Sequence, residues 1–399
     1  MPLEREHSLV EAERRIDDTL HTLGLQPQIQ RHGDTLCSTV VTLHGGPDIS
    51  SERVGCGKGD PDEARVGAKF EAYEHFHSVP ALRAATRPRP FAEVIAQPAL
   101  ADALPVRMIA AQPARHIGVV TFEGSGPAQP PLEHPVFLVD HTYAGTALPD
   151  DDVDYRHARR YACGTGIAVG VGADEALTHA VSEVIERHAV GLWIARTYYR
   201  ADAASERVLD PDTLPASLKT LLATAADALG DAIVLSHAQS DIACPVVVAR
   251  CRQRTVGGLH VAGSGASLYA AHAATRAIKE LVQQYRVAEG EAEAVAHWQR
   301  CARHLARWPR LQRCLALAPG TDGTRLPFSV LGGCPPTSPL PLQQHLQVLL
   351  QRCAQAGRPV WTRILRREAS GVVLGCAAMP RMERFAVAAL GGVVVPAYA

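Results

Sequence analysis

The sequence predicts an α+β fold in which helices pack on several mixed β-sheets. Hydrophobic residues make up 47% of the 399 residues and charged residues 20%, which is enough for a large core. Short strand-like runs alternate with helical segments along most of the chain. No linker-like stretch divides the sequence, so we expect one domain. Residues 1–50 would form its N-terminal helix and first strand, and residues 51–399 the rest.

The elements follow in order from periodicity and from the residues that begin and end them. An amphipathic helix at about 8–24 ends at Gly24, and a glycine turn at 55–59 leads into a second helix through residue 76. The expected strands are 35–44, 114–124, 135–143, 232–238, 244–252, 360–366 and 371–379. Further helices are expected at 174–189, 211–229, 271–287 and 342–357.

Composition excludes several classes of protein. The formal net charge of −1 argues against a general nucleic-acid binder, which is usually basic. No apolar run is long enough to cross a membrane, and the charged N-terminus lacks the apolar core of a secretion signal, so a cytoplasmic protein is predicted. The ten cysteines contain no C-x-x-C pair, so their spacing supports neither a zinc ribbon nor a disulfide framework.

The helix at 174–189 carries three glutamates in a chain with few charges. At about 100° per residue, Glu175, Glu183 and Glu186 fall within about 80° of one another. The simplest interpretation is an amphipathic helix with a solvated acidic face. Two other segments make a shared site a competing interpretation.

Three glycine-rich turns, at 57–59, 164–172 and 263–265, each precede a helix with a pair of polar residues spaced i, i+3. The pairs are Glu71 and Glu74, Glu183 and Glu186, and Glu280 and Gln283. Carboxylates that converge repel one another unless cations neutralise them, so convergence of these helices would indicate bound magnesium. Lys58, Arg187 and Arg276 lie beside the acids and could bind phosphate oxygens. The pattern therefore predicts a site for Mg²⁺ and a nucleoside triphosphate.

These segments resemble the YcaO family in order and spacing. "GKG…ARVGAKFEAYEHF" is similar to the first nucleotide segment of the family. "GIAVGVGADEALTHAVSEVIERHAVGLW" resembles its most distinctive segment, with the acidic residue Glu175 and an ending at Arg187. "GSGASLYAAHAATRAIKELVQ" is similar to the third, with Arg276, Glu280 and Gln283 in matching places.

The resemblance implies a YcaO-type fold that encloses ATP, with 51–399 as the catalytic domain. Magnesium ions would be held by Glu71, Glu74, Glu183, Glu186 and Glu280, and the nucleotide by Lys58, Glu175, Arg187, Arg276 and Gln283. It also implies a reaction in which ATP activates a backbone amide of a ribosomally made precursor peptide. A neighbouring Cys, Ser or Thr side chain would close an azoline ring, external sulfide would give a thioamide, and an amine would give an amidine.

The chain departs from the family pattern at several positions. Ala168 and Val171 stand where members often carry Ser or Ala, and then Asn. Gly67 replaces a usual serine, and His75 follows Glu74 where arginine is usual. The C-terminus contains only Pro396, whereas many azoline-forming members end in a proline-rich tail. No E1-like or peptide-clamp domain precedes residue 50, so leader-peptide recognition is expected from a separate partner protein.

Azoline formation is the leading prediction, ahead of thioamidation, because ring-forming members are numerous. Two alternatives remain: a non-catalytic scaffold with a weakened nucleotide site, and an accessory factor acting on a folded protein such as a ribosomal protein. The sequence leaves the oligomeric state open, a homodimer included.

Overall fold

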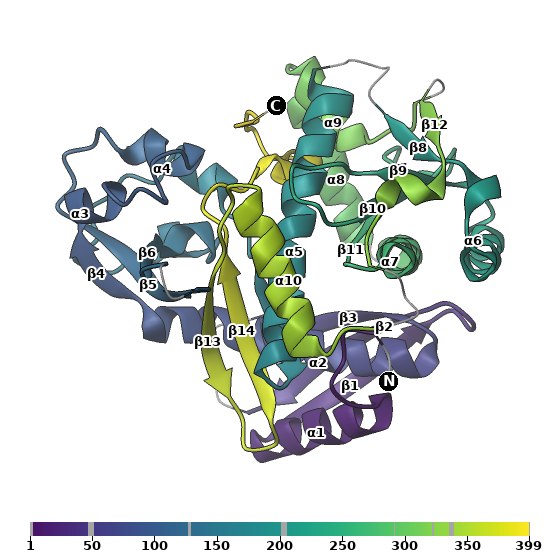
Figure 1. Ribbon diagram of the computed structural model, residues 1–399, viewed down its shortest axis with the longest axis horizontal. Helices are drawn as coiled ribbons and strands as arrows, with labels where there is room; N and C mark the ends of the chain where they lie inside the picture. Colours follow the sequence, from purple (N-terminus) through teal and green to yellow (C-terminus); the bar gives the residue numbers. More distant parts are fainter. Residues whose placement is uncertain are drawn as a thin grey trace.

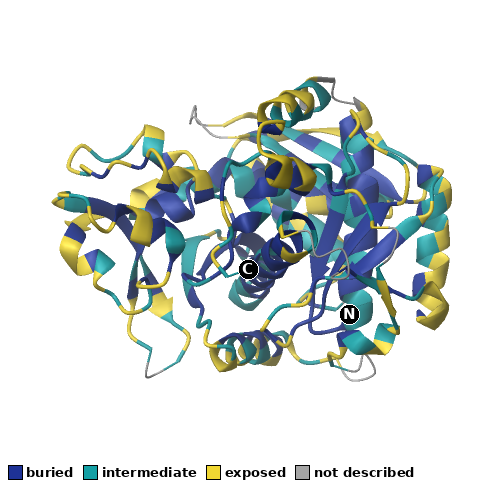
Figure 2. Ribbon diagram, turned by 90° about the horizontal axis from the view of Figure 1, so that it is seen from above, coloured by how far each residue is buried: buried dark blue, intermediate teal, exposed yellow. Residues whose placement is uncertain are grey.

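The computed structural model describes residues 3–46, 52–126, 129–200, 206–290, 292–320, 323–334 and 339–398. In this part of the chain three β-sheets surround a long central helix, α5 (Ala173–Ile194), which runs through the middle of the molecule (Figure 1). Helices packed on these separate sheets, two antiparallel and one mixed, confirm the predicted α+β class. The interior of the molecule is buried, whereas the outer faces of the peripheral helices are exposed (Figure 2).

The first sheet is antiparallel and has the order β1–β2–β3. Its strands are β1 (Leu25–His32), β2 (Cys37–Gly45) and β3 (Val54–Gly59), with helices α1 (Leu9–Thr22) and α2 (Pro61–Ala85) packed against it. Sequence periodicity missed β1, because only Leu25 of this strand is buried and the remaining residues show no apolar alternation. Such an edge strand also tolerates Pro27, whose nitrogen has no hydrogen to donate.

The second sheet has the order β11–β10–β9–β8–β12. Its strands are β8 (Arg207–Leu209), β9 (Ile233–His237), β10 (Val246–Cys251), β11 (Ala262–Ala266) and β12 (Thr324–Leu326). Helices α6 (Ala216–Leu229) and α7 (Ala270–Gly290) pack on this sheet. Helix α8 (Ala292–Leu305) packs on α7, and α9 (Pro309–Ala316) packs on α8. Helix α7 packs directly on β10 and β11 and thereby faces the centre of the molecule.

The third sheet has the order β4–β5–β13–β14–β7, with β6 paired to β5. Its strands are β4 (Arg87–Pro90), β5 (His116–Gly124), β6 (Leu132–Pro135), β7 (Ile167–Val171), β13 (Trp361–Arg367) and β14 (Val372–Ala378). The helices α3 (Phe91–Ile95) and α4 (Leu104–Ile109) lie at its outer end, and α10 (Leu342–Gln355) packs on α5 (Figure 1).

The strand expected at 135–143 is wrong. Pairing with β5 ends at Pro135, and Val136–Leu138 form a buried 3₁₀ turn. The Asp140 carboxylate then accepts hydrogen bonds from the backbone N–H and the hydroxyl of Thr142. Because an Asp side chain that bonds two residues ahead stabilises a turn, the apolar run bends here and does not continue as a strand.

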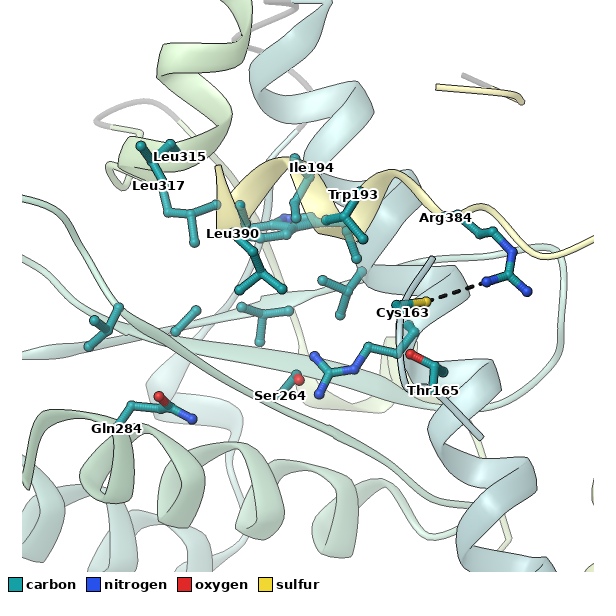
Figure 3. A pocket seen from close by; sticks show the side chains of 18 of the residues that line it. Cys163, Thr165, Trp193, Ile194, Ser264, Gln284, Leu315, Leu317, Arg384 and Leu390 are labelled. Carbon is teal, nitrogen blue, oxygen red and sulfur yellow. Dashed lines mark hydrogen bonds between the residues drawn. The ribbon is translucent and has the colours of Figure 1, made fainter. Parts of the chain in front are cut away.

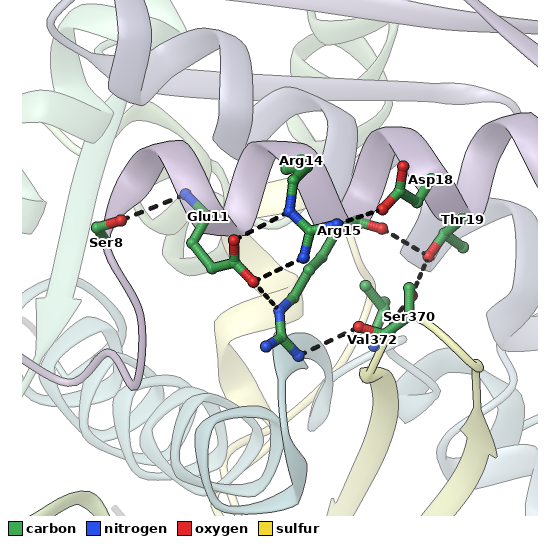
Figure 4. Close-up of polar contacts among 8 residues, drawn as sticks. All are labelled: Ser8, Glu11, Arg14, Arg15, Asp18, Thr19, Ser370 and Val372. Carbon is green, nitrogen blue, oxygen red and sulfur yellow. Dashed lines mark hydrogen bonds and ion pairs between the residues drawn. The ribbon is translucent and has the colours of Figure 1, made fainter.

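Helix α1 is tied to the third sheet by polar contacts. Ser8 caps its first turn, and Arg15 bridges Glu11 and the backbone oxygen of Ser370 in the connection between β13 and β14 (Figure 4). The hydroxyl of Thr19 lies 2.6 Å from that of Ser370. These contacts fix the N-terminal segment against a sheet formed largely from the other end of the chain.

The three glycine segments that sequence analysis interpreted as turns are strands, namely β3, β7 and β11. A Cβ on Gly57 would lie 1.7 Å from the carbonyl oxygen of Ala64 in α2. On Gly170 and Gly263 it would lie 2.6 Å and 2.2 Å from the backbones of α5 and α7. Glycine therefore serves here to let each helix approach its strand, because any side chain would separate the two backbones.

Each of these three strand–helix units contacts the next one, and the third contacts the first. Besides its own strand, α2 contacts β7 of the second unit, α5 contacts β11 of the third, and α7 contacts β3 of the first. The candidate site lies where the three helices meet.

Candidate functional site

The acidic helix at 174–189 is not a solvated face. Glu175 and Glu186 are 3% and 4% exposed, and α5 buries residues on nearly all sides. The amphipathic interpretation is therefore wrong for this helix. Burying a carboxylate is costly unless it is paired or hydrogen-bonded. The partners of these acids therefore indicate what the site can bind.

Electrostatic coupling shows that acids from all three helices lie together. Burial raises the pKa of Glu74 in α2 well above its usual range, and the carboxylates of Glu183 and Glu71 raise it further. Burial also raises the pKa of Glu183 in α5, with contributions from Glu186 and from Glu280 in α7. The five glutamates predicted to hold metal are thus linked by charge repulsion across the three helices. Such mutual repulsion is relieved by bound cations.

Each α5 carboxylate is also positioned by the protein. Glu183 accepts a hydrogen bond of 2.9 Å from the backbone N–H of Gly166, and its other oxygen lies 3.8 Å from the Arg187 guanidinium. Glu186 accepts bonds from the Ser264 hydroxyl at 2.6 Å and from a backbone N–H of β11 at 3.1 Å. Both Glu186 oxygens are therefore engaged by β11, whereas Glu183 is held by one backbone bond.

Helix α7 is linked to β3 by two polar contacts. Lys58 of β3 pairs with Glu280, and the Gln283 side chain donates a hydrogen bond of 2.5 Å to the carbonyl oxygen of Cys56. Burial opposes ionisation of Glu280, but the charges of Lys58 and Arg187 hold its pKa below the usual range. Gln283 consequently has a structural partner, and Lys58 already neutralises one acid of the cluster.

The N-terminal residues complete one side of this site, which sequence analysis did not foresee. Glu175 accepts hydrogen bonds from the Arg5 guanidinium at 2.9 Å and from the backbone N–H of Glu6 at 3.0 Å. Arg5 also lies 2.7 Å from Nε2 of His179, one turn further along α5. A charged segment ahead of an amphipathic helix carries no periodic signal, so only the folded chain reveals these contacts.

Arg276 in α7 faces the same side. Its guanidinium lies 3.8 Å from the carboxylate of Glu4, which is fully buried and also meets His272 at 3.6 Å and His345 at 3.4 Å. The Nε atom of Arg276 is buried and has no hydrogen-bond partner. An unpartnered guanidinium donor next to an acidic cluster fits an incoming phosphate oxygen.

The residues fit Mg²⁺ chemically, since the cluster offers only carboxylate oxygens, which this hard cation prefers. In the part of the chain that the structure describes, no three His, Cys, Asp or Glu side chains approach closely enough to form a complete metal site. Glu71, Glu74 and Glu183 are the acids whose raised pKa values favour a neutralising cation. Glu186 and Glu280 would take part only by exchanging their present partners.

The two departures from the family pattern in β7 are both apolar and buried. Ala168 is 8% and Val171 1% exposed, and they pair with Gly375 and Val372 of β14. Neither side chain can hydrogen-bond a nucleotide. Gly67 lies on the exposed side of α2, where an added Cβ would have only the Cα of Gly57 within 4 Å.

Clustered carboxylates beside Lys58 and Arg187 are typical of sites that bind phosphates through divalent cations. A family model described as YcaO cyclodehydratase, ATP- and Mg²⁺-binding, matches residues 56–383. The chain belongs to the YcaO family. This confirms the family and the cofactors ATP and Mg²⁺ predicted from the sequence. A search of curated protein sequences gives no match.

Solved structures share the fold. YcaO from Methanopyrus kandleri bound with AMPPCP and Mg²⁺ superposes with a TM-score of 0.65 at 19% identity, covering 97% of this chain and 95% of that one. A heterocyclase in complex with substrate and cofactor gives 0.66 at 15% identity, covering 98% of this chain and 56% of that one. The E. coli microcin synthetase McbBCD complex gives 0.54 at 12% identity, covering 90% and 88%.

Among the described residues, no helix has the length and apolar character needed to span a bilayer.

Proposed function

We propose that this protein uses ATP and Mg²⁺ to modify backbone amides of a ribosomally made precursor peptide, and that it forms azolines from Cys, Ser or Thr residues. One observation carries the proposal. Glu183 of α5 and Glu280 of α7 line a cavity of about 370 Å³ whose remaining walls are mostly apolar. A charged site for phosphoryl transfer thus opens onto a space that suits part of a peptide.

The chain's own residues would act by binding and by neutralising charge. Glu71, Glu74 and Glu183 would hold Mg²⁺, and Arg276 and Lys58 would contact phosphate oxygens. Arg187 lines the cavity beside Glu183 and is placed to stabilise negative charge on the substrate. Positioning and electrostatic stabilisation are what phosphoryl transfer requires, and no protein nucleophile is needed.

The bound nucleotide would supply the phosphoryl group that removes the amide oxygen. As the substrate's own thiol or hydroxyl adds to the carbonyl carbon, the oxygen leaves with that group as inorganic phosphate. The products are the ring-containing peptide, ADP and phosphate. An attacking group that already lies beside the carbonyl has a very high effective concentration, which favours ring closure over attack by dissolved sulfide.

ATP turnover tests the acidic site. We expect Glu74→Gln and Glu183→Gln each to lower peptide-dependent turnover at least tenfold, equivalent to about 1.4 kcal/mol of activation free energy. Glu93→Gln, a matched change at an exposed position in α3, should leave turnover unaltered. If Glu74→Gln and Glu183→Gln turn over ATP as fast as Glu93→Gln, these two acids do not serve the nucleotide.

Mass spectrometry of the precursor peptide identifies the product. Ring formation removes the mass of one water per modified residue, whereas thioamidation adds the difference between sulfur and oxygen. A gain that requires added sulfide would establish the alternative reaction at the same ATP site. Tight ATP binding without any product would instead favour a scaffold, the alternative to which Ala168 and Val171 lend support.

A separate protein is proposed to recognise the leader of the precursor. Because tethering raises the effective concentration of the peptide at the site, adding this partner should strongly increase the rate of modification. Full activity of the isolated protein on a free peptide would contradict this part of the proposal.

A further inference from the structure

The cavity beside the acidic cluster is polar at one end and apolar along the rest. Glu183, Arg187 and Glu280 line the polar end. Figure 3 shows Trp193, Ile194, Leu315, Leu317 and Leu390 gathered on the side away from Ser264, Thr165 and Gln284. Val190, Val248, Leu259, Val261, Trp298 and Val387 also line it.

One face of α5 contributes residues to both the polar and the apolar part of the cavity. Glu183, Arg187, Val190 and Ile194 follow one another at spacings of three and four residues and therefore share that face. The apolar part begins at Val190, about 4.5 Å along the helix from Arg187. Consecutive Cα atoms of a peptide are about 3.8 Å apart. A peptide whose reacting amide lies at Arg187 would thus place a flanking side chain against Val190 and Ile194.

The charged groups at the apolar end already have partners. The Glu383 carboxylate is fully buried and accepts bonds from the backbone N–H groups of Phe385, Ala397 and Tyr398. Arg384 donates through one terminal nitrogen to the backbone oxygen of Leu138 at 2.9 Å, while its buried Nε has no partner. The Glu383 carboxylate is therefore not available to pair with a cationic ligand, and the Arg384 guanidinium disfavours one, because burying an unpaired charge is strongly unfavourable.

We propose that this cavity holds a large aliphatic or aromatic side chain flanking the activated amide, and so selects precursor peptides with an apolar residue next to the modified one. This rests on the proposed function and adds the substrate preference of the same site. Leu390 marks the cavity's mouth, because it is 69% exposed whereas Trp193 and Ile194 are 4% and 1% exposed.

The first test compares two precursor peptides that differ only in the residue flanking the modified one, Leu in one and Lys in the other. We expect the wild-type protein to favour the Leu peptide at least tenfold in kcat/KM. Leu390→Asp should reduce this preference at least fivefold, since a carboxylate at the mouth pairs with Lys. Val10→Asp is the matched control, because Val10 is 80% exposed on the distant α1.

A binding measurement separates this inference from the proposed function. Trp193 and Trp298 line the cavity, so their fluorescence should report N-acetyl-leucinamide and not N-acetyl-lysinamide. Selective binding without modification of any peptide would overturn the proposed function and keep the cavity's preference. Modification with equal rates for the Leu and Lys peptides would overturn the inference alone. Competition between N-acetyl-leucinamide and a non-hydrolysable ATP analogue would also overturn it, because the cavity would then hold the nucleotide.

Discussion

Gly57 decides how closely β3 and α2 approach, and its replacement by alanine tests whether that approach positions the acids. The added Cβ would lie 1.7 Å from the carbonyl oxygen of Ala64 and 2.6 Å from the amide nitrogen of Ala68. Ordinary contacts begin at 3.4 Å, so strand and helix must separate by roughly 1.7 Å at this point. The helix that moves carries Glu71 and Glu74.

Two magnitudes follow from this displacement. Overpacking of a dense core costs about 1–3 kcal/mol. Unfolding entropy of about 2.1 cal/mol/K per residue amounts to roughly 0.8 kcal/mol/K for this chain, so Tm should fall by about 1–4 °C. Activity should suffer more, because a misplacement of about 1 Å at a reacting centre costs about 100-fold. Gly57→Ala should therefore remain folded at 25 °C and lose nearly all ATP turnover.

Gly67→Ala is the matched control, because Gly67 lies in α2, the helix that Gly57→Ala would displace. Its Cβ would meet only the Cα of Gly57 at 3.7 Å, which is ordinary contact. Alanine is the better helix former, so this variant should be about 0.5–1 kcal/mol more stable. Calorimetry gives both Tm values, and peptide-dependent phosphate release gives turnover. Wild-type Tm and wild-type turnover in Gly57→Ala would refute the view that this glycine sets the position of α2.

Three further outcomes are expected. Glu206→Gln should destabilise the fold by about 3–5 kcal/mol, because it leaves the fully buried guanidinium of Arg250 without its carboxylate partner. Asp154→Asn, at the exposed ion pair with Arg156, should leave the calorimetric Tm unchanged. Burial lowers the pKa of His134 to about 3. Between about pH 6.5 and pH 3 this histidine is therefore protonated in the unfolded chain and neutral in the folded one. The free energy of unfolding consequently decreases as the pH drops through this range. His134→Phe should reduce that slope by up to about 1.4 kcal/mol per pH unit in urea titrations, and an unchanged slope would contradict the assignment. ATP-analogue binding to wild-type protein should vanish in EDTA and return with Mg²⁺, as measured by calorimetric titration.

The sequence by itself determined the local elements and the family. Helix α1 and the strands β5, β9, β10, β13 and β14 follow from short-range periodicity, which a chain displays wherever one face is buried. Family membership followed from the order and spacing of the glycine-rich and acidic segments, and the family model confirms it over residues 56–383.

Two local predictions failed because tertiary context outweighed sequence pattern. The apolar run at 135–143 became a turn once Asp140 bonded Thr142. Strand β1 gave no signal because it lies at a sheet edge with nearly all its side chains exposed.

Only the tertiary structure decided what the glycines and the acids do. Gly57, Gly170 and Gly263 could not be distinguished from turn residues in the sequence, because their role depends on a helix backbone that approaches each strand. Likewise the buried state of Glu175 depends on Arg5 and Glu6, which reach it from 169 or more residues away in sequence. Contacts over such separations are set by how whole sheets and helices stack, which no local pattern encodes.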